Sequence, residues 1–169
     1  LGMGLLNKLY LRFPTPFWPT TYDWLTYLAL EKGQWSEWLS LYRPTQKPIL
    51  LGFTAAAFGR TIEQWSDEKL VNSAMSTLHT IFGRQIPAPT AWQITRWASD
   101  PFAYGSYSFY KVGSTPDSRT ALAAPVAGRL FFAGEATAAD YPGTVHGAYL
   151  SGLRAAEEIG RPLRDLQIV

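Results

Sequence analysis

Runs of large apolar residues, separated by short polar turns, fill the first third of the chain. Residues 5–13 are rich in Leu, Tyr and Phe and end at a Pro-Thr-Pro turn, so they predict a strand that Lys8 and Arg12 interrupt. Residues 49–53 form an uninterrupted apolar run, which is typical of a buried strand. From similar runs across residues 22–58 we predict an antiparallel or mixed sheet.

Two later segments carry apolar residues at helical spacing. In the first, Ser66 is a suitable N-cap and Gly83 is placed to end the helix. Asp67 and Glu68 suit the positive end of a helix, so we predict a helix over residues 67–82. The second segment predicts a helix whose apolar stripe consists of Val145, Ala148, Tyr149, Gly152, Leu153, Ala156 and Ile159.

The residues between these helices predict shorter elements. Residues 92–97 alternate as a strand does, and residues 100–110 predict a loop that carries many aromatic side chains. Residues 119–129 predict a connection of small residues. Residues 130–134 predict a short, wholly apolar strand of the kind that lies inside a parallel sheet.

Composition narrows the range of functions. The 169 residues suffice for one domain, and aromatic residues make up 15% of them, including seven Trp. The net charge of +2 is scattered, so we expect neither a nucleic-acid partner nor a membrane partner. No cysteine is present, which excludes disulfides and zinc-thiolate sites, and we expect no metal site. The composition does not determine the cellular compartment, and we expect the cytoplasm.

The segment from residue 130 to residue 159 is the best candidate for chemistry. A strand ending in Gly134 and Glu135 places a carboxylate where the strand gives way to a loop, which suits contact with ligand hydroxyls. The helix that begins near Thr144 and Val145 offers free N–H groups to an anionic or carbonyl-bearing ligand. An ordinary β–α unit with a charged loop has the same spacing, so both interpretations stay open.

Three ordered motifs resemble the flavin-dependent amine oxidases. RLFFAGEAT at residues 129–137 and YPGTVHGAYLSG at residues 141–152 resemble the C-terminal flavin motif of that family. WASDPFAYGSYS at residues 97–108 resembles its aromatic-loop motif, and LLNK at residues 5–8 resembles its lysine-bearing strand. The family includes polyamine oxidases, lysine-specific histone demethylases, monoamine oxidases and L-amino-acid oxidases. The pattern is most similar to the polyamine oxidase and histone demethylase branch.

The resemblance implies FAD as cofactor and an amine as substrate. In the family, the amine gives a hydride to flavin N5, and O2 reoxidises the flavin with release of hydrogen peroxide. The resemblance implies that Lys8 lies by N5 and holds a water there, as the catalytic residue. It also implies that Gly134 and Glu135 belong to the cofactor site, with Glu135 bonded to the ribityl chain. Thr144 and Val145 would meet the pyrimidine edge of the flavin.

The aromatic loop supplies the implied substrate side of the site. By resemblance, Trp97 and Phe102 pack near the isoalloxazine ring, and Tyr107 forms one wall of the substrate pocket. Monoamine oxidases and many polyamine oxidases have a second cage tyrosine where this sequence has Thr144. A half-open cage would admit longer or bulkier amines, so we expect a polyamine-like substrate.

The implied fold joins α+β and α/β parts. Residues 1–115 would form most of a mixed-sheet substrate-binding domain with flanking helices. Residues 116–169 would add the closing strand and helix of an FAD/NAD(P)-binding, Rossmann-like domain. Gly2-Met3-Gly4 has neither a preceding strand nor a third glycine, so we do not assign it to a dinucleotide loop. The chain begins with Leu1, and we expect it to be a C-terminal fragment, inactive alone, whose partner is the N-terminal half of the same protein.

Two alternatives remain open. An L-amino-acid oxidase needs an arginine for the substrate carboxylate, and Arg12, Arg96 and Arg119 are candidates outside any motif. The other alternative is an isolated fragment without catalytic function. A hydrolase triad of Ser106, Asp140 and His146 is not supported, since neither Ser106 nor His146 lies in a nucleophile elbow.

Overall fold

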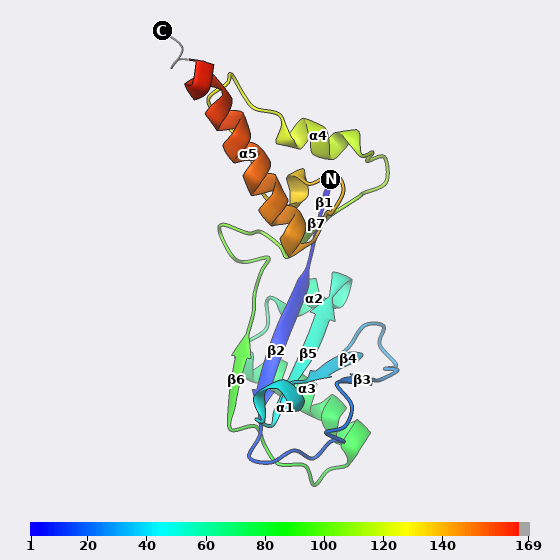
Figure 1. Cartoon of the computed structure of the whole chain (residues 1–169). Coiled ribbons are helices and arrows are strands. Elements are labelled where there is room, and N and C mark those ends of the chain that lie inside the picture. The colour runs from blue at the N-terminus through cyan, green and yellow to red at the C-terminus, as the bar shows by residue number, and fades with distance from the viewer. Residues whose placement is uncertain (166–169) are drawn as a thin grey trace. The chain divides into compact units, whose positions relative to one another are not determined.

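The computed structural model describes residues 1–165, with side chains described up to residue 160. Its contacts define two compact units (Figure 1). We call Leu5–Ser106 the sheet unit. The helix unit combines Leu1–Gly4 with the chain from Tyr107 onward. Both units mix helices with antiparallel strands, which agrees with the mixed α and β composition predicted from the sequence.

The sheet unit is built on a five-stranded sheet with the strand order β3-β4-β5-β2-β6. Strand β2 (Leu6–Arg12) pairs antiparallel with β5 (Ile49–Ala55) on one side and with β6 (Ala91–Ile94) on the other. Strand β4 (Glu37–Ser40) joins β5 to the edge strand β3 (Trp24–Thr26), also antiparallel. The strands predicted at residues 5–13 and 49–53 are therefore confirmed.

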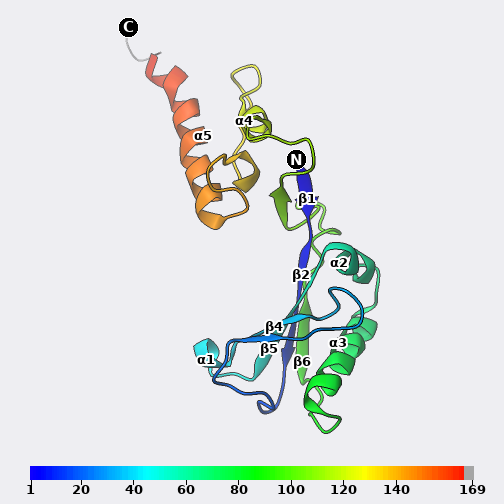
Figure 2. The ribbon, with the colours of Figure 1, turned by 90° about the vertical axis from the view of Figure 1, so that its right-hand side faces the viewer.

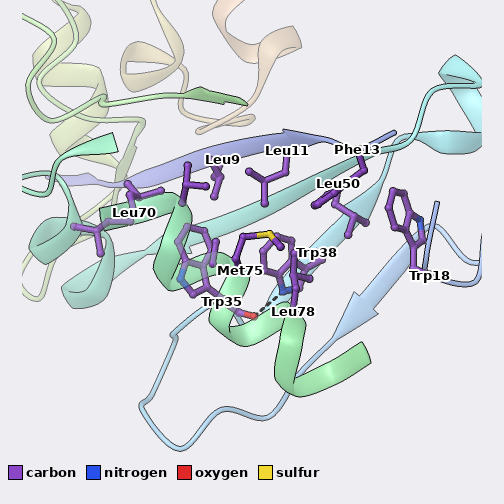
Figure 3. Packing of buried hydrophobic residues seen from close by; sticks show 13 residues of the cluster. Leu9, Leu11, Phe13, Trp18, Trp35, Trp38, Leu50, Leu70, Met75 and Leu78 are labelled. Carbon is purple, nitrogen blue, oxygen red and sulfur yellow. Dashed lines mark hydrogen bonds between the residues drawn. The ribbon is translucent and has the colours of Figure 1, made fainter. Parts of the chain in front are cut away.

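Helix α3 (Asp67–Phe82) covers one face of this sheet (Figure 2). The side chain of Ser66 accepts a hydrogen bond from Lys69 N, and Gly83 ends the helix with φ +92°, as the sequence predicts. The core between sheet and helix holds two stacked indole rings, those of Trp35 and Trp38, with centroids 5.6 Å apart (Figure 3). Its other buried members are Leu9, Leu11, Phe13, Trp18, Leu50, Ile62, Leu70, Val71, Ala74, Met75 and Leu78.

Two short helices complete the sheet unit. Helix α1 (Tyr42–Thr45) follows β4, and helix α2 (Ala56–Ile62) begins where β5 ends. Side chains alternate along β2, so Leu9 and Leu11 face α3 while Lys8 lies on the opposite face. The carboxyl end of α2 and the residues after β6 meet on the core side, where Glu63 bonds to Arg96 and to Asn7, the residue before Lys8.

The helix unit contains a two-stranded sheet and three helical elements. Strand β1 (Gly2–Gly4) pairs antiparallel with β7 (Tyr107–Phe109). Because Gly2-Met3-Gly4 is a strand, it is not a dinucleotide loop, which confirms its rejection. Helix α4 (Asp117–Ala123), the 3-10 turn η1 (Glu135–Thr137) and helix α5 (Val145–Asp165) follow.

Three sequence-based predictions need correction in the helix unit. Residues 130–134 form no strand, since Leu130 makes only an isolated antiparallel bridge to Val126. A strand exists only where it has a ladder partner, and the described strands provide none for this apolar run. The small-residue connection over 119–129 begins inside α4, and the aromatic loop over 100–110 ends in β7.

Helix α5 is confirmed, but its predicted apolar stripe is exposed. Val145 is 88% exposed and Tyr149 is 68% exposed. The residues of α5 that are buried within the helix unit are instead small, namely Gly147, Ser151 and Ala155. Small side chains let η1 approach closely, and Ser151 Oγ accepts a hydrogen bond from Gly134 N at 2.8 Å. Among the described residues, no helix is long and apolar enough to cross a membrane.

Candidate functional site

Lys8 lies on the sheet face that is opposite the core. It is half-buried and pairs in register with Phe53 of β5. Phe53 stacks on Trp24 with ring centroids 5.6 Å apart, so an aromatic surface adjoins the ammonium-bearing side chain. A cavity of about 450 Å³ opens beside Phe53, and its lining includes Leu6, Phe53, Phe58 and Glu37. Phe53, the register partner of Lys8, therefore lines a hollow that is mostly apolar and carries one carboxylate, Glu37, and one cation, Lys32.

Trp97 and Phe102 follow β6 in the sheet unit. The Trp97 backbone N–H donates to Asn7 Oδ1 at 3.0 Å. Trp97 as a whole is 37% exposed. Phe102 is 96% exposed, and its N–H donates to Asp100 Oδ1 at 2.8 Å in a tight turn. Both residues therefore have a fixed backbone and an accessible ring, which suits contact with a flat ligand.

A buried polar network joins the segment after β6 to β2 and α2. Asn7 Nδ2 donates to Glu63 Oε1 at 2.6 Å. The same carboxylate accepts from Ala98 N at 3.1 Å and from Ser99 Oγ at 2.7 Å. Burial by itself raises the pKa of Glu63, but hydrogen bonds from Asn7, Ser99 and Ala98, with the charge of Arg96, leave that pKa below its ordinary value. Glu63 is therefore held as a carboxylate.

Arg96 is fully engaged at the end of α2. Its guanidinium donates to the carbonyl oxygens of Glu63 at 2.8 Å and Trp65 at 2.9 Å. It also pairs with Asp67 Oδ1 at 2.6 Å. A cation at the carboxyl end of a helix is favourable because the free carbonyls carry partial negative charge. The guanidinium of Arg96 is thus already bonded within the protein, and a substrate carboxylate would have to compete with these partners.

Tyr107 belongs to the helix unit, where it lies across from Gly4 in the two-stranded sheet. A Cβ placed on Gly4 would come within 3.0 Å of the Tyr107 ring. Gly2 stands in the same relationship to Phe109, at 2.4 Å. These two glycines therefore make room for two rings on one side of β1, and Tyr107 stays 39% exposed.

Glu135 connects β7 to the turn before α5. Its Oε1 accepts from Ser108 N at 2.6 Å, and its Oε2 accepts from Ser108 Oγ at 2.8 Å and from Gly143 N at 2.7 Å. The carboxylate thus links Ser108, which follows Tyr107, to Gly143, which precedes Thr144. One of its about four lone-pair positions remains for a further donor, such as a ligand hydroxyl.

Arg119 is buried completely beneath this carboxylate. Its Nη1 donates to Ser108 Oγ at 2.7 Å and to the carbonyl oxygen of Ala136 at 3.1 Å. Its side chain lies 3.8 Å from Glu135 Oε2 and over the ring of Tyr110. Since Arg119 is 0% exposed, it has no access to a carboxylate in solution. Neither Arg96 nor Arg119 therefore supports the L-amino-acid oxidase alternative.

Thr144 caps α5, a role that the sequence motif did not suggest. Its Oγ1 donates to Tyr141 O at 2.7 Å and accepts from Gly147 N at 3.0 Å. The first i to i−4 bond of the helix runs from Ala148 N to Thr144 O at 3.0 Å. The amides of Val145 and His146 precede that bond, so helix geometry leaves them without an intrahelical acceptor.

These residues fit a flavin by the chemistry of their donors. The first-turn amides of α5 point outward at the positive end of a 21-residue helix, beside an exposed Val145. Open space surrounds Gly134 and Gly143, where a Cβ would meet no atom within 4 Å. Amide donors next to an uncovered apolar side chain suit a flat ring with a carbonyl edge.

The structure groups the predicted site residues by unit. Lys8, Trp97 and Phe102 belong to the sheet unit, and the network of Asn7 and Glu63 links the first two. The helix unit holds Tyr107, Gly134, Glu135, Thr144 and Val145. Sequence reasoning missed Asn7, Glu63, Ser108 and, as a site-supporting residue, Arg119. Only Asn7 left a signal, as a polar residue at a core-facing position of an apolar strand.

Comparisons with known proteins give the family. The model of the family described as flavin containing amine oxidoreductase matches residues 1–160. Lysine-specific histone demethylase 1 homolog 1 of Oryza sativa subsp. japonica is 41% identical over 170 residues, which cover 97% of this chain and 20% of that protein. Polyamine oxidase 2 of Arabidopsis thaliana is 40% identical over 158 residues, which cover 94% of this chain and 32% of that protein.

A third relative, described as possible lysine-specific histone demethylase 1 of Drosophila melanogaster, is 39% identical over 94% of this chain and 19% of its own length. The chain thus spans between about a fifth and a third of these three relatives. The cofactor that the family match implies is FAD. The resemblance drawn from the three sequence motifs is confirmed, and the chain belongs to the flavin containing amine oxidoreductases.

Proposed function

We propose that the protein containing this chain oxidises an amine with FAD, and that its substrate is polyamine-like. The observation that carries the proposal is the family match over residues 1–160, together with 40% identity to a polyamine oxidase. The chemistry that FAD supplies when bound is the two-electron oxidation of the amine, with O2 as final acceptor and hydrogen peroxide as product. The imine product is hydrolysed by water.

In this proposal the sheet unit supplies the catalytic lysine and two aromatic walls. Lys8 holds a water through its ammonium group, and its half-buried position on a sheet face supports that role. Trp97 and Phe102 offer accessible rings to the cofactor and to the cationic amine. A cation over an aromatic face gains about 0.5–2 kcal/mol. The amine must lose its proton before it reacts, and a desolvating aromatic pocket lowers the amine pKa in that direction.

The helix unit supplies the remaining contacts to the cofactor. Thr144 and Val145 would bind the pyrimidine edge, where the start of α5 stabilises negative charge by about 0.3–1 kcal/mol. Glu135, with Gly134 beside it, would accept a hydrogen bond from the ribityl chain through its remaining lone pair. Tyr107 would form a wall of the substrate pocket. We assign helix α5 to the closing part of a Rossmann-like domain, within residues 116–169.

The cavity beside Phe53 supports a long substrate. Its apolar lining suits a methylene chain, and Glu37 offers a carboxylate to a second ammonium group, against the opposing charge of Lys32 in the same lining. The chain covers 32% of the polyamine oxidase relative, and we propose that residues outside this chain bind the ADP end of FAD. A chain of 169 residues purified alone would then be inactive.

A second candidate substrate comes from the relatives named lysine-specific histone demethylases. A methylated lysine side chain is a bulky secondary or tertiary amine, and Thr144 in place of a cage tyrosine leaves room for such a group. This candidate uses the same site and the same oxidation. The two candidates differ only in the molecule that carries the amine.

The test measures hydrogen peroxide from the FAD-loaded, full-length protein. We expect peroxide with spermidine or spermine, less with a methylated lysine peptide, and none with L-amino acids. Lys8→Met should lower kcat about 10²–10⁴-fold, the range for a positioned proton-handling side chain, while Lys47→Met on the exposed surface should not. Peroxide from the methylated peptide alone would favour the second candidate. Silence with every amine, or flavin bound by residues 1–169 alone, would reject the proposal or its division of the cofactor site.

A further inference from the structure

Two residues proposed to border the flavin, Lys8 and Trp97, share one buried anchor. Asn7 precedes Lys8 in β2, and its side chain points to the core, where it is 3% exposed. Its Oδ1 accepts from Trp97 N at 3.0 Å, while its Nδ2 donates to Glu63 Oε1 at 2.6 Å. One carboxamide therefore joins β2, the end of α2 and the segment that carries Trp97.

Thr95 extends the anchor to the backbone of Lys8. Its Oγ1 accepts from Lys8 N at 2.8 Å and donates to Asn7 Oδ1 at 3.3 Å, and its N–H donates to Lys8 O at 3.0 Å. The ladder between β2 and β6 ends at Ile94, so these side-chain bonds continue the alignment of two segments beyond the sheet. Linked hydrogen bonds of this kind polarise one another and hold a single geometry.

Glu63 fixes the next two residues of the same segment. Its carboxylate, 7% exposed, accepts from Ala98 N and from Ser99 Oγ. Residues 95–99 belong to no strand or helix, so their amides depend on side-chain acceptors. Burying a carboxylate costs free energy that its hydrogen bonds must offset, so such a group is a poor source of stability. Its better-supported use is to fix one arrangement of the groups around it.

We infer that Asn7 and Glu63 are positioning residues, which fix the backbone of residues 97–99 against β2 and so set the place of the Trp97 ring relative to Lys8. The inference rests on the proposed function, in which both residues border the flavin. Neither Asn7 nor Glu63 touches substrate or cofactor in this account. They act through the backbone amides that they bind.

A purely structural role predicts a different result from a positioning role. If Glu63 only stabilises the fold, its replacement lowers stability and leaves the folded site unchanged. If it positions Trp97, the folded protein itself has an altered flavin environment. Glu63→Ala separates the two, and Glu63→Gln is the conservative variant, because its Oε1 can still accept from Asn7 and Ala98 while its Nε2 donates to Ser99 Oγ. Glu63→Ala leaves the Asn7 and Ala98 donors unpaired.

The experiment compares the FAD-loaded, full-length protein with Glu63→Ala, Glu63→Gln and the matched control Glu31→Ala, whose site is exposed. Amide hydrogen exchange is measured over residues 95–99 and over α3, together with the flavin absorbance spectrum and with kcat and KM for the amine. In Glu63→Ala we expect exchange at residues 97–99 to rise about tenfold or more, with α3 unchanged. We expect a shifted flavin spectrum and a kcat lowered about tenfold to a hundredfold, with KM nearly constant.

Glu63→Gln and Glu31→Ala should both resemble the unaltered protein in all three measurements. Unchanged exchange at residues 97–99 in Glu63→Ala would overturn the inference. Faster exchange with an unchanged flavin spectrum and an unchanged kcat would also overturn it, since the anchor would then be structural only. An unaltered protein that binds FAD but oxidises no amine contradicts the proposed substrate, and exchange with the flavin spectrum still decides the role of Glu63. An unaltered protein that binds no flavin rejects both proposals at once.

Discussion

The ring of Tyr107 lies against Gly4, so close that a Cβ on Gly4 would stand 3.0 Å from ring atom Cε2. The two residues are register partners in the sheet of β1 and β7. Contacts this short require the ring to move when a methyl group is added. Gly4 therefore determines where an aromatic wall of the proposed pocket stands, although it has no side chain of its own.

Gly4→Ala should displace the Tyr107 ring and weaken amine binding. We expect KM for the amine to rise about threefold to tenfold, since the displaced ring loses part of a cation–π contact of about 0.5–2 kcal/mol. Steady-state kinetics of the FAD-loaded protein measure the change. Gly2→Ala is the control, because its Cβ meets Phe109 at 2.4 Å and leaves Tyr107 alone. Equal effects of the two substitutions on KM would remove Tyr107 from the pocket.

Thr144→Val should loosen the start of α5, because valine keeps the shape of threonine and lacks the hydroxyl that accepts from Gly147 N. Loss of an N-cap costs about 1 kcal/mol, so the Gly147 amide should exchange about fivefold faster. Thr144→Ser retains the cap and should exchange at the original rate. Exchange that is the same in all three proteins would show that the cap contributes nothing measurable.

Two glycines of α5 should respond in opposite directions to the same substitution. In Gly147→Ala the new Cβ would lie 2.0 Å from Tyr141 O, a backbone atom that cannot move aside alone, and overpacking of this kind costs about 1–3 kcal/mol. In Gly152→Ala the Cβ meets nothing within 4 Å, and the helix should gain about 0.5–1 kcal/mol. Thermal unfolding midpoints, lowered in the first variant and raised in the second, check this pair.

Because of the buried Glu63, the free energy of unfolding should vary with pH in the acid range. Its pKa is lowered in the folded protein, because the hydrogen bonds from Asn7, Ser99 and Ala98 outweigh the opposing effect of burial. At acid pH the unfolded chain therefore binds more protons at this site than the folded chain. The stabilising contribution is complete above the ordinary glutamate pKa of about 4.3 and is lost as pH falls through the lower, folded value.

The comparison of unaltered protein with Glu63→Gln tests this dependence. The difference between their unfolding free energies should be largest above about pH 5 and should shrink toward pH 3. Ser99→Ala removes one donor to the carboxylate and should raise the Glu63 pKa, which carboxyl NMR titration measures directly. A difference that grows as the pH falls would contradict the assigned direction of the shift.

The elements predictable from the sequence are those whose signals are local. The helix over residues 67–82 has its cap, its apolar spacing and its terminal glycine within one segment, and the structure confirms all three. The apolar run at residues 130–134 predicts burial but says nothing of a ladder partner, which is a non-local requirement. Helix α4 is missed for another reason, since the small residues of the segment 119–129 favour a connection and carry no helical apolar spacing.

The candidate site divides in the same way. Motif letters alone suggest Lys8, Trp97 and Glu135 as site residues, and their roles stay predictions, while the family match covers the segments that carry them. The partners that hold them come from distant segments, as in the contact of Asn7 with Glu63 across 56 positions of sequence. Such contacts depend on where β2, α2 and β6 meet in three dimensions. The sequence indicates Asn7 in one way only, as a polar residue at a core-facing position of an apolar strand.

The hydroxyl of Ser106 accepts from Leu6 N and donates to Leu6 O, so the sheet unit is closed where its chain enters and leaves. All strands of the five-stranded sheet lie within residues 5–106, whereas the described partner of β1 lies beyond them. Synthesis of residues 5–106 occupies on the order of 5–20 s. Strand β1 emerges from the ribosome before the whole sheet unit, and its described partner β7 follows only after that unit.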